Sequence, residues 1–155
     1  MDAVNTHHAF DQVWTSGQLS EADLDRLGSQ CFAAVINLAP PDHPDALAGE
    51  GEKVTGRGMS YLQIPVAWDA PTLEQLDLFC GAMRALQGRK VWVHCAKNMR
   101  VTAFIYLYRR LVLGEDAAAA RHPLREVWQP NEVWRGFIEQ GLKGRPSLTQ
   151  TPPSS

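Results

Sequence analysis

Hydrophobic residues along this chain form short continuous runs that alternate with longer stripes of helical spacing. Three runs of strand length lie at residues 32–38, 61–66 and 91–93, and each is bounded by turn-forming or charged residues. A further short strand is predicted over residues 13–19 and ends in a turn. Short apolar runs of this kind, rich in β-branched residues, are typical of buried strands.

The stripes between and after these runs predict helices. The most regular stripe follows Pro71, at a first-turn position where proline is tolerated. Its apolar positions are Leu73, Leu76, Phe79, Cys80, Met83 and Leu86. A second stripe consists of Val101, Phe104, Ile105, Tyr108, Leu111 and Val112. Shorter helices are predicted over residues 21–27, 45–55, 115–122 and 130–142.

Strands that alternate with helices indicate an α/β fold with a mostly parallel central sheet flanked by helices. In such sheets, ligands bind beyond the carboxyl ends of the strands. A length of 155 residues suits one domain with its own core. We expect a flexible N-terminus at residues 1–12, a single domain at 13–143, and a polar, proline-rich, disordered tail at 144–155.

Composition narrows the range of partners. A formal net charge of −2 gives no overall attraction for nucleic acids or anionic membranes. No apolar run is long enough to span a bilayer, and the first residues lack the features of a secretory signal. Three cysteines without paired spacing argue against a disulfide framework, so we expect a reducing, cytoplasmic location. The sequence gives no indication of the oligomeric state.

The segment His94–Arg100 carries the most specific chemical signal. Cys95 follows a short apolar strand and precedes a helix, so it lies where the first unpaired N–H groups of that helix converge. These donors and the helix dipole favour an anion there, either a thiolate or a bound oxyanion. Arg100 adds a planar fork of donors that suits a tetrahedral oxyanion. One turn therefore combines a candidate nucleophile with an anion-binding group.

Five short segments occur in a recognisable order between residues 13 and 113. They are Ser16-Gly17-Gln18, Val35–Leu38, Ile64–Val66, Pro71-Thr72 and His94–Arg100. In this order they resemble the bacterial branch of the protein tyrosine and dual-specificity phosphatase superfamily. The resemblance implies a dual-specificity-phosphatase-like fold and hydrolysis of a phosphomonoester without a cofactor or a metal. The substrate would be a phosphorylated protein or a small-molecule phosphate ester.

The resemblance also implies roles for individual residues. Cys95 would attack phosphorus and form a phosphocysteine intermediate. Arg100 would bind the phosphoryl oxygens and hold them in the transition state. Backbone N–H groups of the loop would assist it, and the loop residues between the two are Ala96, Lys97, Asn98 and Met99. His94 is expected to orient the loop through a hydrogen bond rather than to act as an acid or base.

A general acid must protonate the leaving oxygen, and Asp69 is the candidate. It lies between the end of a strand and Pro71, in a loop that could swing over a bound phosphate. Asp69 is equally well placed to cap the following helix, where its carboxylate would accept a hydrogen bond from a free N–H. Three aromatic or polar residues could also line the pocket: Trp68, Asn131 and Trp134.

The loop departs from the common phosphatase pattern. Four residues, rather than five, separate Cys95 from Arg100. The loop lacks glycine, although Asn98 tolerates a positive φ better than most residues do. Val101 stands where a hydroxyl usually follows the arginine, and Thr102 comes one position later, where it could reach the thiolate.

This departure leaves two alternatives open. The six-residue span from Cys95 to Arg100 has the length found in rhodanese-like sulfurtransferases, in which the cysteine carries a persulfide. The chain could therefore be a sulfurtransferase or another persulfide-handling enzyme. It could also be a catalytically silent phosphate-binding module that needs the arginine but not the thiol. The other cysteines, Cys31 and Cys80, are expected in the core, and His7-His8 lacks a third metal ligand at a sensible spacing.

Overall fold

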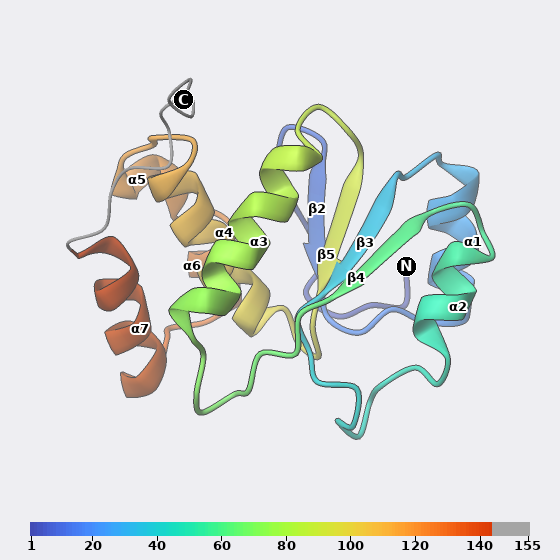
Figure 1. Ribbon diagram of the computed structural model, residues 1–155, viewed down its shortest axis with the longest axis horizontal. Helices are drawn as coiled ribbons and strands as arrows, with labels where there is room; N and C mark the ends of the chain where they lie inside the picture. Colours follow the sequence, from blue (N-terminus) through green and yellow to red (C-terminus); the bar gives the residue numbers. More distant parts are fainter. Residues whose placement is uncertain (144–155) are drawn as a thin grey trace.

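The computed structural model describes residues 1–143 as a five-stranded sheet with helices on both faces (Figure 1). The strands stand in the order β1-β2-β5-β3-β4. Strand β1 pairs antiparallel with β2, whereas the other neighbours run parallel to one another. The strands are β1 (His7–Phe10), β2 (Val13–Ser16), β3 (Ala34–Asn37), β4 (Ser60–Gln63) and β5 (Val91–His94). The predicted α/β fold with a mostly parallel sheet is confirmed.

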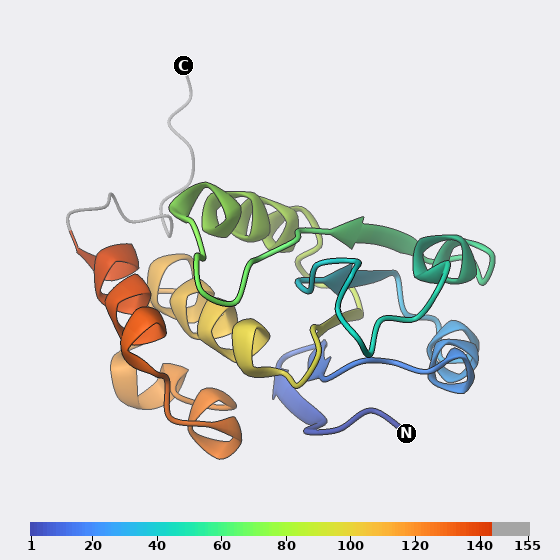
Figure 2. The same cartoon turned by 90° about the horizontal axis from the view of Figure 1, so that it is seen from below.

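Two groups of helices enclose the sheet (Figure 2). The smaller group consists of α1 (Glu21–Ser29) and α2 (Glu50–Thr55). The larger group, on the opposite face, consists of α3 (Leu73–Ala85), α4 (Met99–Leu111), α5 (Ala117–Ala120), α6 (Leu124–Val127) and α7 (Glu132–Leu142). Among residues 1–143, no helix has the length and apolar character needed to cross a membrane.

The central strands β3 and β5 bury both of their faces. Val35 and Trp92 belong to the core beneath α1 and α2, whereas Ile36 and Val93 belong to the core beneath α3 and α4. None of these four side chains is more than 4% exposed. Full burial of a large apolar side chain stabilises a fold by about 1.5–3 kcal/mol. Burial on both faces therefore fixes the positions of β3 and β5, and with them the positions of the residues that directly follow these strands.

Local sequence decides where the first two helices begin. Ser20 and Asp23 form a capping box before α1, as the sequence predicts. Helix α2 begins at Glu50, later than the predicted start at residue 45. Gly49 adopts φ +68° directly before the helix, a left-handed conformation that a right-handed helix cannot contain. Helix α2 therefore begins only after this glycine.

The start of α3 corrects the prediction that Asp69 caps this helix. The side chain of Thr72 accepts a hydrogen bond from the Gln75 N–H, and the Gln75 side chain accepts one from the Thr72 N–H. Pro71 therefore precedes the cap instead of occupying the first turn. The short helix predicted over residues 115–122 is present as α5, with the narrower bounds Ala117–Ala120 and with Asp116 as its N-cap.

The structure departs from two other expectations. Residues 7–10, within the segment expected to be flexible, form strand β1, which pairs with β2 across a tight turn at Asp11 with φ +46°. Cys31 was placed in the core by the prediction, but it is exposed, because the chain turns there after α1 with φ +63°. Cys80 is buried as predicted. The tail predicted at residues 144–155 lies outside the described residues.

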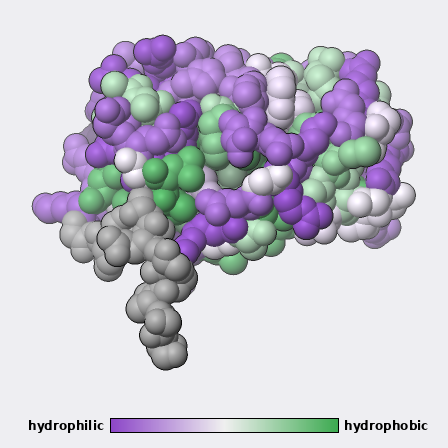
Figure 3. Space-filling view, turned by 90° about the horizontal axis from the view of Figure 1, so that it is seen from above, coloured by the Kyte–Doolittle hydropathy of each residue, from purple (hydrophilic) through white to green (hydrophobic). Residues whose placement is uncertain are grey.

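The two ends of the sheet differ in character. The end at which the parallel strands begin presents mainly hydrophilic residues, with separate hydrophobic groups between them (Figure 3). At the other end, three loops leave adjacent strands at Gly17, Leu38 and Cys95. Ligands of parallel sheets bind at this second end, so the fold places Cys95 where the sequence predicts a site.

Gly17 occupies a tight space between the N-terminal segment and the loop after β5. A Cβ atom at this position would lie 2.5 Å from Ala96 O and 2.7 Å from Val4 Cγ2. We predict that Gly17→Ala lowers the free energy of unfolding by about 1–3 kcal/mol, as overpacking does. Urea denaturation measures this change.

Gly136 provides the matched control, because a Cβ added there meets nothing within 4 Å. It lies inside α7, so Gly136→Ala should raise the free energy of unfolding by about 0.5–1 kcal/mol. A Gly17→Ala variant as stable as the wild type would contradict this prediction, because it would show that the loop after β5 and the N-terminal segment can move apart without loss of stability.

Candidate active site

Cys95 lies directly after β5 and is 1% exposed. Its N–H donates a hydrogen bond of 3.4 Å to the carbonyl of Ser16, at the end of the neighbouring strand β2. On the other side, β3 ends at Asn37, which is level with His94 in the sheet. The cysteine is a free thiol held at the carboxyl ends of three parallel strands.

The carbonyl groups of the loop are bonded on its outer side. Ala96 O accepts a hydrogen bond of 3.0 Å from the Gln18 N–H, and Lys97 O accepts one of 3.0 Å from Asn5 Nδ2. In a planar trans peptide, the N–H points opposite to the C=O of the same unit. The N–H of Lys97 therefore points away from Gln18, toward the inner side of the loop.

Asn98 leads from the loop into α4. It adopts φ +67°, which confirms that it takes the left-handed conformation for which the sequence offers no glycine. Its Nδ2 donates to Asn5 O at 2.8 Å and to Thr15 Oγ1 at 3.0 Å. The first N–H groups of α4, those of Met99 and Arg100, have no acceptor within the helix. They and the helix dipole make this end of α4 favourable for an anion.

A cavity of about 260 Å³ lies over the loop, lined by Trp68, Cys95, Ala96, Lys97, Met99 and Arg100. Arg100 is 8% exposed and donates from Nη1 to Val66 O at 3.2 Å. Its guanidinium lies 5.7 Å from the centre of the Trp68 ring. Its Nε is buried without a hydrogen-bond partner. An unpaired buried donor is unfavourable, so this arginine favours an oxyanion in the cavity.

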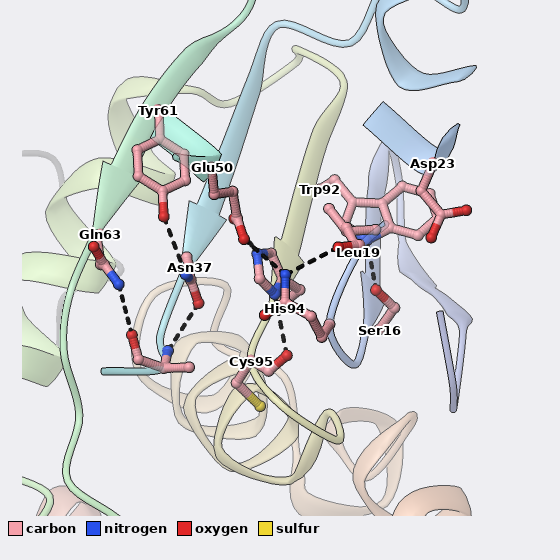
Figure 4. A network of polar contacts seen from close by, with 12 residues as sticks. Ser16, Leu19, Asp23, Asn37, Glu50, Tyr61, Gln63, Trp92, His94 and Cys95 are labelled. Carbon is pink, nitrogen blue, oxygen red and sulfur yellow. Dashed lines mark hydrogen bonds and ion pairs between the residues drawn. The ribbon is translucent and has the colours of Figure 1, made fainter. Parts of the chain in front are cut away.

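His94 connects the loop to a buried carboxylate behind it (Figure 4). His94 Nε2 lies 2.5 Å from Glu50 Oε2, and Nδ1 lies 3.1 Å from Cys95 O. Both ring nitrogens therefore lie within hydrogen-bonding distance of an oxygen atom. Glu50 also accepts a hydrogen bond of 2.7 Å from Gln18 Nε2. His94 is fully buried and lies behind the loop, outside the set of residues that line the cavity.

Burial and hydrogen bonding compete in this buried polar network. Burial alone raises the pKa of Glu50, but the hydrogen bonds from His94 and Gln18 and the charge of His94 outweigh it, so its pKa lies below the ordinary value. Burial raises the pKa of Tyr61 to about 12. At neutral pH the network therefore holds an ionised carboxylate beside a neutral phenol. Within residues 1–143, no three potential ligand side chains are arranged to hold a metal ion.

Asp69 does not line the cavity. It is exposed in a turn between β4 and α3, whereas its neighbour Trp68 lines the cavity as predicted. Trp134, which is fully buried, holds this turn by donating from Nε1 to Trp68 O at 2.8 Å. The structure therefore brings Cys95 and Arg100 together and leaves the predicted acid outside.

Thr102 supports the start of α4. Its hydroxyl donates to Met99 O at 2.9 Å and accepts from Trp128 Nε1 at 3.1 Å. Because its hydrogen is bonded to that carbonyl, Thr102 stabilises the first turn instead of donating to the thiol. Asn131, a predicted pocket residue, caps α7 by accepting the Trp134 N–H at 3.0 Å, and neither of them lines the cavity.

Three residues that hold the loop are absent from the sequence-based predictions of the site: Asn5, Gln18 and Glu50. Gln18 belongs to the Ser-Gly-Gln segment, which indicated the family but gave no role. Asn5 is 92 residues from its partner Lys97, and Glu50 is 44 residues from His94. Pairs so distant in sequence become neighbours only through the fold, so no local pattern marks them.

Known proteins resemble this chain in sequence and in fold. Residues 1–132 match the profile of a family described as a DSP-PTPase phosphatase fused to NAD+ kinase. A crystal structure of a protein assigned to the DUF442 phosphatases, from Shewanella putrefaciens CN-32, is 32% identical to this chain with a TM-score of 0.79. The match covers 90% of this chain and 92% of that chain. No curated protein matches the sequence.

More distant structures share the fold. PTPMT1, crystallised with PI(5)P, is 16% identical with a TM-score of 0.75, and the match covers 88% of this chain and 93% of that chain. The catalytic domain of SIW14 from S. cerevisiae, described as a PP-IP phosphatase, is 16% identical with a TM-score of 0.70. That match covers 90% of this chain and 86% of the other. These similarities support the arrangement of sheet and helices described above.

The Glu50–His94 pair leads to a prediction about stability and pH. We expect Glu50→Gln to lower the free energy of unfolding at pH 7 by about 1–3 kcal/mol, the usual cost of losing a hydrogen bond to a charged group. The pKa of Glu50 is lower in the folded protein than in the unfolded chain. Its stabilisation is therefore present above the unfolded pKa and is lost as the pH falls through the folded pKa. The difference from wild type should shrink as the pH falls below 4.5, the ordinary value.

Urea denaturation across a pH series measures this difference. Glu52→Gln serves as the control, because Glu52 lies on the same helix and is exposed. Its effect should stay within about 0.5 kcal/mol at each pH, as is usual for surface substitutions. A Glu50→Gln deficit that does not change with pH would argue for lost packing rather than lost charge.

Proposed function

The chain belongs to the DSP-PTPase phosphatase family whose profile it matches, and from this membership we propose that it hydrolyses phosphomonoesters through Cys95. One observation carries the proposal: a buried cysteine and a buried arginine line the same cavity. The arginine has an unpaired Nε, and the start of α4 adds unpaired N–H groups. Such a site suits a tetrahedral oxyanion beside a sulfur nucleophile.

In the proposed first step, the Cys95 thiolate attacks phosphorus and the bond from phosphorus to the ester oxygen breaks. The leaving oxygen takes a proton from Asp69, and the phosphoryl group remains on sulfur. In the second step, water attacks phosphorus, Asp69 takes a proton from that water, and the sulfur leaves as a thiolate. Arg100 and the inner N–H groups of the loop would hold the phosphoryl oxygens in both steps.

The acid role of Asp69 requires its turn to change position. The side chain is exposed and lies outside the cavity, although the adjacent Trp68 lines it. Loops that close over a bound substrate commonly complete a catalytic site in this way. Because Trp134 and Arg100 both hold the backbone of this segment, the movement must break or carry these hydrogen bonds.

Two side chains that line the cavity indicate which kinds of phosphate ester it could bind. Trp68, which is 40% exposed, offers an aromatic surface, and the exposed Lys97 offers a positive charge. Both favour an ester that carries a planar group or a further negative charge. A substrate panel should therefore include a phosphotyrosine peptide and PI(5)P. NADP+, a phosphomonoester that an NAD+ kinase produces, belongs in the panel because of the family description.

Sulfur transfer is a second candidate, favoured by the length of the loop. The six residues from Cys95 to Arg100 match the span of rhodanese-like sulfurtransferases. Such an enzyme would carry an outer sulfur on Cys95 as a persulfide and pass it to a thiolate acceptor. With thiosulfate as donor, the Cys95 thiolate would take the outer sulfur, the S–S bond of thiosulfate would break and sulfite would leave. Mass spectrometry of the Cys95 peptide would then show a gain of one sulfur atom if this candidate is correct.

We predict that the wild-type protein hydrolyses p-nitrophenyl phosphate with EDTA present and that Cys95→Ser abolishes the activity. Asp69→Asn should lower kcat by about 10²–10⁴-fold, the usual contribution of general acid catalysis. The loss should be greater for an alkyl phosphate, whose leaving oxygen needs the proton more. Asp11→Asn, at the exposed β1–β2 turn remote from the cavity, is the matched control and should leave kcat unchanged.

The outcomes separate the candidate functions. Activity lost with Cys95→Ser but unchanged in Asp69→Asn would keep the enzyme class and remove Asp69 as the acid. No turnover by wild-type protein with a reduced thiol would reject the phosphatase proposal. A persulfide on Cys95 would then support sulfur transfer, and phosphate binding that survives Cys95→Ser would support a silent binding module.

A further inference from the structure

The N-terminal segment forms a strap along the outer side of the loop after β5. Val4 O accepts a hydrogen bond of 2.8 Å from the Gly17 N–H. The N–H of Asp2 donates to Asp23 Oδ1 at 2.8 Å, at the start of α1. These contacts fix residues 2–4 on the body of the domain, and Asn5 follows directly.

Asn5 makes two hydrogen bonds to the loop. Its Nδ2 donates to Lys97 O at 3.0 Å, and its carbonyl accepts from Asn98 Nδ2 at 2.8 Å. Asn5 and Asn98 both adopt a positive φ, +52° and +67° respectively, a conformation that asparagine tolerates better than most residues. The Asn5 side chain thus bonds the residue before Asn98, and the Asn98 side chain bonds the backbone of Asn5, although the two asparagines are 93 residues apart in sequence.

These bonds act where the loop changes into a helix. Asn98 lacks a side-chain hydrogen bond to the first turn of α4, so the usual N-cap does not hold the start of this helix. Its side chain is turned instead to Asn5 and Thr15. Lys97 O, one position earlier, is bonded to Asn5 alone among the described residues. The direction of the Lys97–Asn98 peptide therefore depends on the strap.

We propose that Asn5 is a positioning residue for the reaction at Cys95, a proposal that rests on the function proposed above. Asn5 does not line the cavity and acts through the loop. By holding the Lys97 carbonyl and the Asn98 side chain, it keeps the first turn of α4, with its unpaired N–H groups, directed at the bound oxyanion. Such donors are effective only when they are already oriented before the charge develops.

The test uses two variants at Asn5 and one control in the same strap. Asn5→Gly keeps the carbonyl and the positive φ but removes the Nδ2 donor. Asn5→Asp keeps the shape and places a carboxylate against Lys97 O. Asn5 is exposed, so both variants should fold, and thermal unfolding checks this. Thr6→Val is the control, because it removes the bond of 2.9 Å from Thr6 Oγ1 to Ala3 O without touching the loop.

The measured quantity is the rate of alkylation of Cys95 by iodoacetamide, followed by mass spectrometry of its peptide, with increasing inorganic phosphate. Protection by phosphate gives a dissociation constant without requiring turnover. One lost hydrogen bond predicts a rise of about 5- to 10-fold in that constant for Asn5→Gly. Asn5→Asp should weaken binding further, and kcat/KM should fall in parallel. Thr6→Val should match the wild type, even if its thermal stability falls.

Equal phosphate protection in Asn5→Gly and wild type would overturn the positioning role. A similar loss in Thr6→Val would also overturn it, because the strap would then act only through stability. Failure of phosphate to protect even wild-type Cys95 would reject the proposed function. In that case the pH profile of alkylation without phosphate decides, and an unchanged profile in Asn5→Gly would overturn the positioning role separately.

Discussion

The site depends on one constraint, which is the direction of the peptide groups between Cys95 and Arg100. A short loop can turn its N–H groups inward only if the opposite carbonyl groups find partners outside. Gln18 supplies such a partner after β2, and Asn5 supplies another from the N-terminal segment. His94 supplies a third and is itself held by Glu50 of α2. Residues from separate parts of the chain therefore fix the conformation of a loop of six residues through hydrogen bonds.

Much of the fold follows from local patterns in the sequence. The runs at residues 32–38 and 91–93 became the central strands because their residues are apolar on both faces, which only a doubly covered strand buries. Strand β1 was missed because its sequence, His7–Phe10, shows no clear alternation and gains its stability from pairing with β2. The boundary of α3 was misplaced because two polar residues compete for the cap. The Thr72–Gln75 box forms two hydrogen bonds, whereas a single carboxylate offers one.

The candidate site likewise contains residues that local sequence predicts and residues that it does not. Cys95 and Arg100 could be predicted as candidates because a strand, a cysteine and a helix start follow one another within a few residues. The conformation of Asn98 could be predicted from its residue type and from the missing glycine. The residues that hold the loop from outside could not, since Asn5 and Glu50 reach it only after the chain has folded. Local sequence specifies the candidate reacting groups, and tertiary structure specifies the residues that hold them in place.

Arg100 shares a hydrogen bond with the segment that carries Asp69, from Nη1 to Val66 O. An oxyanion in the cavity competes with this carbonyl for the same guanidinium. Affinity for the oxyanion and the equilibrium of the turn are therefore thermodynamically linked, and linkage acts equally in both directions. A substitution that favours the observed turn therefore weakens the affinity, at most by the factor with which the oxyanion disfavours that turn. The buried aromatic cluster around Trp134, which holds the turn from behind, can thus tune affinity without contacting the ligand.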